Sequence, residues 1–303
     1  LTESQGGAVV AALAQTVGQL HAQGACLDFN TLKPEELARL TPFFVQLTNA
    51  FRTQGLTSCI VLSGGQPLWE DQDLIQSFDQ VILKMFQLPW IGSAPMPLAS
   101  DQWFKDTLTQ ALTKIGPEKI VVALGNFAVD WSSGAALPET LPYAAAMQRI
   151  SQAGAELRFS AKTSNSFSSY RDAAGKLHKI WMLDAASAHN QLVILRQLGV
   201  ANVAVWSLGQ EDPGLWTVLA GEQENKPVLS TQLASVPVDH YVDYSGEGAF
   251  LRIKQRPRVG LLQTSFDPQT GRLVDQTYGV IPQPYSVERY GKPDPTKLVL
   301  TFD

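Results

Sequence analysis

Five short apolar runs alternate with helix-like segments along the first two thirds of the chain, and this order constrains the fold more than any other feature. The runs lie near residues 25–30, 57–63, 79–86, 119–124 and 202–206. Between them, apolar residues recur every three or four positions, which predicts amphipathic helices. Strands that alternate with helices form a parallel sheet. We therefore expect an α/β fold in which the five runs lie side by side, parallel and in chain order.

Two stretches depart from this alternation. Residues 132–183 read as an α+β insertion with one helix and two strand-like runs. After Trp216 the sequence changes to short strand-like runs, and Asp267–Gly271 has the composition of a hairpin turn. We expect a barrel-like domain over residues 1–217 and a β-rich segment over 218–290. The prolines from Pro282 onward predict a stiff, extended tail.

Composition excludes several classes of function. The chain has 303 residues, of which 45% are hydrophobic and 17% are charged, as in a globular protein with a large core. The net charge of -5 comes without a basic block, so we expect no nucleic-acid partner. No apolar run has the length of a membrane span. The chain begins Leu-Thr-Glu-Ser rather than with Met, and we expect it to be part of a longer protein.

The sequence offers no set of residues with metal-ligand spacing, so we expect no metal and no cofactor. The four histidines show neither ligand nor triad spacing and read as structural. The two cysteines, Cys26 and Cys59, both lie in expected strands. We interpret them as two buried thiols that pack as small hydrophobic side chains. A disulfide between them is the alternative.

The first apolar run carries the residues most suggestive of chemistry. Alternation along Gln23–Asn30 places Cys26, Asp28 and Asn30 on one face. A carboxylate at the C-terminal end of a parallel strand lies where α/β barrels place their active sites. The run resembles the fourth-strand signature of glycoside hydrolase family 18, Asp-Gly-x-Asp-x-Asp-x-Glu. Gly24 and Asp28 match this signature, whereas Asn30 stands at the position of the catalytic Glu.

Three later segments extend the resemblance over roughly residues 1–217. Residues 80–90 resemble the sixth strand, but its Met-x-Tyr-Asp pattern is replaced by Lys84, Phe86 and Gln87, so both polar residues of the pattern are lost. Residues 119–131 resemble the seventh strand and its Tyr-Asp-Trp exit. Residues 205–216 resemble the eighth strand, whose Trp forms the floor of the sugar site in that family; here it is Trp206.

The resemblance implies a TIM-barrel-like (β/α)8 fold of glycoside hydrolase type. Only the fourth to eighth strands of that barrel have counterparts, so we expect a barrel that is incomplete at its N-terminus, followed by the small β-rich segment. The resemblance also implies which residues form the site. We expect Asp28 and Asn30 at the catalytic positions and a set of substrate-binding residues at the same end of the sheet: Trp206, Gln87, Phe86, Asp130, Trp131 and Trp90.

Some of these residues have an equally simple structural interpretation. Packing within loops explains Trp90 and Trp131 as well as sugar binding does, and Asn30 could either bind a sugar or fill an inactive site. Glu211 and Asp212 follow the last strand, and capping of a helix is the simpler role for them.

The family's mechanism decides which function we expect. In family 18 chitinases a Glu protonates the leaving oxygen while the N-acetyl group of the substrate attacks the anomeric carbon. An amide at Asn30 cannot donate that proton. We therefore expect a degenerate, chitinase-like domain that binds an N-acetylglucosamine-type polysaccharide without hydrolysing it. One alternative is an active glycosidase that uses Asp28 with a loop carboxylate such as Asp130 or Glu211. Another is a structural module.

The C-terminal residues have a resemblance of their own. Pro295–Asp303 resembles the first strand of the polysaccharide deacetylases, so we read 291–303 as a linker and the start of an adjacent deacetylase domain. The structural alternative is a module that positions this deacetylase. Together, the two resemblances point to bacterial membrane proteins that join a family 18-like domain, a deacetylase and a family 2 glycosyltransferase. They imply an extracytoplasmic location, in the periplasm or at the cell surface.

Overall fold

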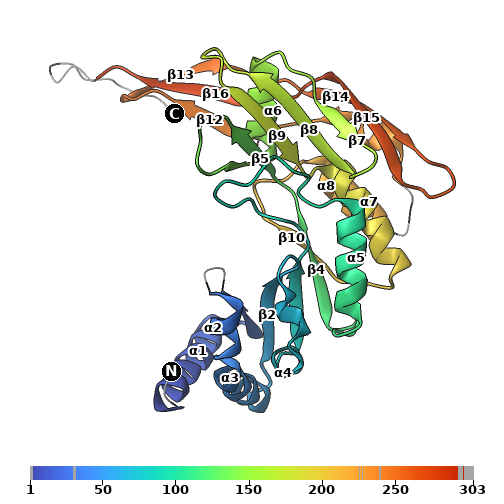
Figure 1. The fold of residues 1–303 in the computed structure, drawn as a ribbon. Coiled ribbons are helices and arrows are strands. Elements are labelled where there is room, and N and C mark those ends of the chain that lie inside the picture. The colour runs from blue at the N-terminus through green and yellow to red at the C-terminus, as the bar shows by residue number, and fades with distance from the viewer. Residues whose placement is uncertain are drawn as a thin grey trace. The chain divides into compact units, whose positions relative to one another are not determined.

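The computed structural model describes residues 3–29, 32–224, 226, 228–238, 240–292 and 296. Contacts group these residues into two compact units that interleave along the chain (Figure 1). The first unit takes Leu1–Leu88, Pro97–Gly125 and Asn190–Leu208. The second unit takes Pro89–Met96, Asn126–His189 and Gly209–Asp303. These units are groups of residues in contact, so the domain bounds expected from the sequence stay a prediction.

A five-stranded parallel sheet forms the centre of the first unit. Its strands are neighbours in the order β1-β2-β3-β4-β10, as the sequence predicted. They span β1 (Gly24–Asp28), β2 (Thr57–Ser63), β3 (Gln80–Lys84), β4 (Ile120–Gly125) and β10 (Val203–Trp206). All four pairings are parallel. The fold is therefore α/β, a partial barrel in which β1 and β10 each have one strand neighbour among the described residues.

Helices alternate with the strands as the periodicity predicted, beginning with one before β1. They are α1 (Glu3–Gln19), α2 (Pro34–Ala38), α3 (Thr41–Thr53), the 3-10 turn η1 (Pro67–Glu70), α4 (Gln72–Ser77), α5 (Asp101–Leu112) and α7 (Ala185–Gln197). Helices α1 and α3 lie side by side in Figure 1. Val10 and Val17 of α1 bury their side chains in one cluster with Leu47 and Phe51 of α3. Ser100 caps α5 by accepting a hydrogen bond from the Trp103 amide.

The two faces of the sheet differ in burial. In β2, β3 and β4 one set of alternate residues is fully buried, namely Ile60, Leu62, Val81, Leu83, Ile120, Val122 and Leu124. The residues between them, such as Val61, Ile82 and Val121, are only half-buried. Because side chains alternate between faces, the second set forms the opposite face of the sheet. That face also carries the residues that the sequence singled out in β1 and β10.

Gly24 is required by the close approach of β1 to β2. A Cβ at this position would lie 1.9 Å from the carbonyl oxygen of Thr57. We expect Gly24→Ala to lower the free energy of unfolding by about 1–3 kcal/mol, since the strands must move apart to fit the methyl group. Gly18→Ala in α1 is the matched control, because no atom lies within 4 Å of the added Cβ. Denaturant unfolding followed by circular dichroism should find Gly18→Ala neutral or slightly stabilised; equal losses in both variants would contradict this explanation.

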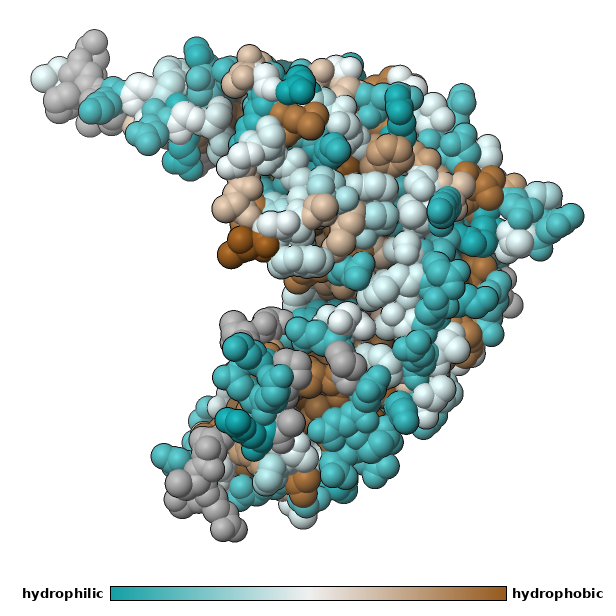
Figure 2. Space-filling view, in the orientation of Figure 1, coloured by the Kyte–Doolittle hydropathy of each residue, from teal (hydrophilic) through white to brown (hydrophobic). Residues whose placement is uncertain are grey.

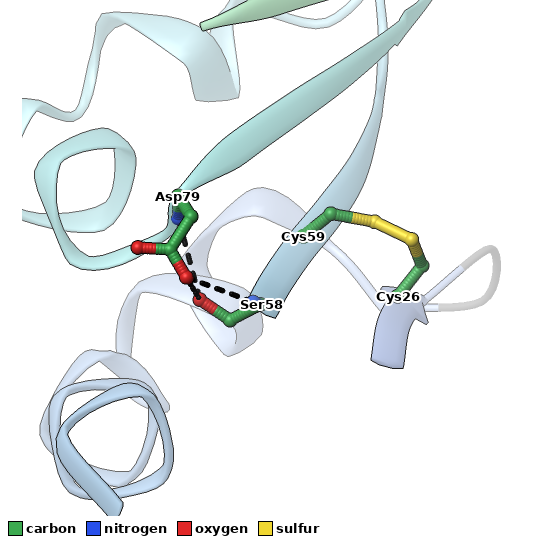
Figure 3. Close-up of a disulfide and its surroundings, with 4 residues drawn as sticks. All are labelled: Cys26, Ser58, Cys59 and Asp79. Atoms are coloured by element: carbon green, nitrogen blue, oxygen red, sulfur yellow. Dashed lines mark hydrogen bonds between the residues drawn. A yellow bond between two sulfur atoms is a disulfide. The ribbon is translucent and has the colours of Figure 1, made fainter. Parts of the chain in front are cut away.

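The cysteines are joined, so the expectation of two free thiols is wrong. Cys26 and Cys59 face each other across the β1–β2 register and form a disulfide, with their Cα atoms 4.4 Å apart (Figure 3). Cys26 is exposed whereas Cys59 is buried. The strand assignment was correct, but it did not show that the two cysteines would be directly opposite. The bond attaches the edge strand β1 covalently to β2.

A polar contact attaches β2 to β3 next to this disulfide. The Asp79 carboxylate accepts hydrogen bonds from the backbone N–H and the hydroxyl of Ser58, both at 2.8 Å (Figure 3). Partial burial would raise the pKa of Asp79, but the hydrogen bonds from Ser58 and the charge of Arg52 together lower it. The contact therefore stabilises the start of β3 beside β2.

The second unit contains an antiparallel sheet of order β6-β5-β9-β8-β7. The strands are β5 (Ala128–Ser132), β6 (Glu139–Leu141), β7 (Arg158–Ser160), β8 (Asn165–Arg171) and β9 (Leu177–Met182), and helix α6 (Tyr143–Gln152) contributes to their core. The sequence predicted the helix and the runs at β7 and β9. It missed β8, because Asn-Ser-Phe-Ser-Ser-Tyr-Arg lacks the apolar alternation of a strand.

The rest of the second unit holds two three-stranded sheets and the short helices α8 (Gly214–Gln223) and α9 (Ser230–Leu233). One sheet joins β11 (Ser235–Val236), β14 (Gly260–Phe266) and β15 (Leu273–Val280), and the expected turn at Asp267–Gly271 connects β14 to β15. The other joins β12 (Val242–Ser245), β13 (Phe250–Gln255) and β16 (Tyr285–Tyr290), with β16 in the middle (Figure 1). Up to Tyr290 the tail expected after Pro282 is extended, but as β16 it is paired within this sheet.

Large apolar side chains are exposed at several places on the surface. On the face of the second unit seen in Figure 2 they form separate small groups among polar residues. Exposed examples are Ile91 and Leu137 of the second unit and Leu208 of the first unit. Within the described residues, no helix is both long enough and apolar enough to cross a bilayer.

Candidate functional site

Three chemically distinct side chains meet at the C-terminal end of the parallel sheet. Asp28, Lys84 and Trp206 are the last residues of β1, β3 and β10. The register leads from Asp28 through β2 to Ile82, two residues before Lys84. In the same way Lys84 pairs with Ala123, and Ala123 lies two residues before Gly125, which pairs with Trp206. A spacing of two keeps side chains on one face, so all three project from the half-buried face of the sheet.

Lys84 connects the other two residues. Its Nζ lies 3.3 Å from Oδ1 and 3.4 Å from Oδ2 of Asp28. The same Nζ lies 4.9 Å from the centroid of the Trp206 ring, within the range of a cation–π interaction. The Lys84 side chain is 9% exposed and that of Asp28 is 25% exposed. The cluster is therefore a nearly buried ammonium between a partly accessible carboxylate and an indole.

Phe86 and Gln87 lie on the segment that follows β3. Phe86 is buried, and its ring centroid lies 6.3 Å from that of Trp206 at an interplanar angle of 35°. Gln87 is half-buried, and its backbone N–H donates to the carbonyl of Leu98 at 2.7 Å. Phe86 thus supports the Trp206 ring, and Asn30 lies outside the described residues. The peptide bond between Trp206 and Ser207 is cis.

Lys84 was not among the residues expected in the site. The comparison with the Met-x-Tyr-Asp pattern recorded it only as a lost match. A signal was nevertheless present, because Lys84 is the one charged residue in the strand-like run at 80–86. A lysine there needs a partner of opposite charge.

Asp130, in the second unit, lies in an ion-pair network. Its side chain is 1% exposed. It accepts one hydrogen bond from Arg149 at 3.0 Å and pairs with Nδ1 of His178 at 2.8 Å. Arg149 also donates two hydrogen bonds to Glu139, which lower the pKa of that carboxyl. This network joins four elements, namely β5, β6, α6 and β9.

Trp131 and Trp90 differ from each other in exposure. Trp131 is buried, donates a hydrogen bond to Ser93 Oγ at 3.3 Å and lines a pocket of about 350 Å³. Lys179 and several serines share the walls of this pocket. Trp90 is 60% exposed. For Asp130, Trp131 and Trp90, membership in the strand-end site stays a prediction.

Two aspartates cap helices in the buried core of the second unit. Asp184 accepts a hydrogen bond from the Ser187 amide at the start of α7. Asp212 accepts from the amides of Ala185 and Gly214, both at 2.9 Å, which agrees with the capping role. Burial, and next the charge of Asp184, raise the pKa of Asp212 to about 7. Both carboxylates are buried, so we assign them a structural role.

No metal centre is apparent in the part of the chain that the structure describes. There, no group of three or more His, Cys, Asp or Glu side chains is arranged to hold an ion. The strand-end cluster contributes a single carboxylate beside an ammonium, which is not a donor set for a cation.

The chain is similar in sequence and in fold to several enzymes of known or proposed lytic and glycosylase type. No family model matches the sequence. The cortical fragment-lytic enzyme of Bacillus subtilis (strain 168) is 23% identical over 216 residues, covering 64% of this chain and 48% of that enzyme. An uncharacterized glycosylase of the same organism, YvbX, is 20% identical over 206 residues, 65% of this chain and 60% of that protein. The chain thus spans about half the length of the first of these relatives.

Solved structures show the same fold. A chitinase from Chromobacterium violaceum ATCC 12472 superposes with a TM-score of 0.65 at 20% identity, over 72% of this chain and 71% of that one. The Bacillus cereus spore cortex-lytic enzyme SleL superposes with a TM-score of 0.62 at 20% identity, over 70% and 51% of the two chains. The chain therefore has the α/β-barrel fold of family 18-type chitinases and related glycosidases, in partial form.

Proposed function

We propose that the chain binds an N-acetylated polysaccharide through the strand-end site and does not hydrolyse it. A family 18-type reaction needs a proton donor at position 30, where this chain has Asn. It also needs a hydroxyl to hold the acetamide, where this chain has Phe86. An amide and a phenyl ring supply neither group.

The ion pair between Lys84 and Asp28 is the main observation that supports this proposal. Both oxygens of the remaining carboxylate lie within 3.4 Å of the ammonium. An ionised carboxylate accepts hydrogen bonds and has no proton to give, so Asp28 in this pair does not replace the missing acid. The indole of Trp206 and the polar groups beside it are still suited to a sugar, which offers apolar C–H faces and hydroxyls. The similarity to chitinases and cortex-lytic enzymes supports a polysaccharide as the ligand.

Removing the indole should weaken binding. We expect Trp206→Ala to reduce the affinity for chitooligosaccharides at least about tenfold, since loss of an aromatic anchor costs about 1.4 kcal/mol or more. Trp216→Ala is the matched control, because Trp216 is an exposed tryptophan of α8. Isothermal titration calorimetry on both variants, with folding checked by circular dichroism, measures the difference. An unchanged affinity in Trp206→Ala would return this residue to a purely structural role.

The active-glycosidase alternative has less support. Asp130 is held by Arg149 and His178 with its side chain almost fully buried, which leaves it little freedom to act as a loop carboxylate. Release of reducing ends from a chitooligosaccharide by the unmodified domain would favour this alternative. A domain that binds no glycan would instead favour a structural module that positions a neighbouring deacetylase. The residues that resemble a deacetylase lie almost wholly outside the described part of the chain.

We also propose that the domain works outside the cytoplasm, as part of a bacterial membrane protein that makes or modifies a surface polysaccharide. The disulfide between Cys26 and Cys59 supports this location, since such bonds persist in oxidising compartments and are rare in the cytosol. Finding both cysteines reduced in the cells that make the protein would contradict it.

A further inference from the structure

Lys84 occupies an unusual position for a lysine. Lys84 is the last residue of β3, and the residues before and after it in the chain, Leu83 and Met85, are fully buried. Its own side chain is 9% exposed. An ammonium removed from water in this way is costly unless an opposite charge compensates for it. Asp28 supplies that charge, and the Trp206 ring supplies a second favourable surface.

A carboxylate beside an aromatic face is a binding arrangement for cations. Aromatic rings attract ammonium groups through their negative faces, and a carboxylate adds a charge-assisted hydrogen bond. Asp28 and Trp206 together would therefore receive a protonated amine. Lys84 already places its own ammonium there, within 3.4 Å of both carboxylate oxygens and 4.9 Å from the ring centroid. The chain thus fills this cation site from within.

We propose that Lys84 is a specificity-determining residue that makes the site select sugars with an uncharged N-acetyl group and exclude sugars with a free, protonated amine. This inference rests on the proposed glycan binding at the same site. An incoming ammonium would meet the like charge of Lys84, to which the Asp28 carboxylate is already paired. Like charges at such distances repel strongly in a partly buried site. An acetamide carries no charge and escapes this repulsion.

The proposal is tested with two tetrasaccharides that differ only in acetylation. Calorimetry at about pH 6, where amines of this kind are protonated, compares tetra-N-acetylchitotetraose with its fully deacetylated form. The unmodified chain should prefer the acetylated form by at least about tenfold. Lys84→Met keeps the length of the side chain and removes its charge. We expect this variant to bind the deacetylated form at least about tenfold more tightly than the unmodified chain does.

Three further variants show where the effect originates. Asp28→Asn added to Lys84→Met should abolish the gain, and added salt should weaken it, because the carboxylate attracts the amine. Lys114→Met, which removes a charge from an exposed position of the first unit, should change nothing. Lys84→Gln provides a polar replacement if the methionine variant does not fold.

The outcomes separate this proposal from the proposed function. The same preference in the unmodified chain and in both Lys84 variants overturns the role of Lys84 and leaves glycan binding intact. In a second outcome, the unmodified chain binds neither tetrasaccharide while a Lys84 variant binds the deacetylated one. That result supports exclusion by Lys84 and refutes the native binding function. If no protein in the series binds either sugar, both proposals fall.

Discussion

Restoring the acid at position 30 alone should leave the domain close to inactive on chitooligosaccharides. Asn30→Glu supplies a proton donor, and such a group contributes roughly 10²–10⁴-fold in rate when the nucleophile is in place. Here the acetamide nucleophile would not be held, because Phe86 has no hydroxyl and Gln87 replaces an acid of the family pattern. Orientation of reacting groups is worth up to about 7–11 kcal/mol. A donor that faces a badly oriented nucleophile therefore gives little turnover.

A gain is expected only when the partners are added. The triple variant Asn30→Glu/Phe86→Tyr/Gln87→Asp should hydrolyse a fluorogenic chitobioside measurably faster than the single variant. Adding Lys84→Met should raise the rate further, because it releases both oxygens of Asp28 from the ammonium. Initial rates of fluorophore release compare the four proteins. Robust hydrolysis by the unmodified domain would refute the binding-module proposal altogether.

Loss of the disulfide should destabilise the chain by about 3–4 kcal/mol. Cys26 and Cys59 are 33 residues apart in sequence, and closing a loop of that length removes this much conformational entropy from the unfolded state in the chain-entropy model. The expected loss exceeds that for most single substitutions. Because β1 is an edge strand that ends at Asp28, glycan affinity should fall along with stability.

A reductant provides the comparison for this prediction. Dithiothreitol should lower the denaturant midpoint of the unmodified chain, and the double variant Cys26→Ser/Cys59→Ala should start at the lower midpoint. Ser suits the exposed position, whereas Ala avoids placing a hydroxyl at the buried Cys59. The double variant should not respond to the reductant. A midpoint of the unmodified chain that stays constant on reduction would show that the disulfide contributes nothing.

The sheet of the first unit could be predicted from the sequence because its signal is local and repeated. Buried parallel strands read as continuous apolar runs, and each run is followed by a helix with a clear period. The strand order follows from the chain order in a barrel, so Asp28 and Trp206 could be expected at one end of the sheet. Their contact with Lys84 could not be inferred in this way, because it depends on a register between strands that are far apart in sequence.

The other misses have the same kind of cause. The disulfide depends on Cys26 and Cys59 being opposite each other, which a shift of one residue would prevent. Strand β8 is mostly polar and has a weak pattern of its own. It is identified by its pairing with β7 and β9 on either side, which the local sequence does not show. Strand β16 follows two prolines, which suggested an extended tail. Prolines are tolerated just before a strand, and β12 and β13 complete the sheet on either side of it.

The interleaving of the two units has a consequence for how the protein is made. On the ribosome, β1 to β4 of the first unit emerge by residue 125, but β10, which carries Trp206, follows only after 64 residues of the second unit, Asn126–His189. Until β10 is made, the edge of β4 therefore has no partner strand from its own unit. An unpaired strand edge can associate with other chains. During synthesis at about 5–20 residues per second, this waiting period lasts several seconds. The vulnerable species is thus a nascent chain that ends before residue 203.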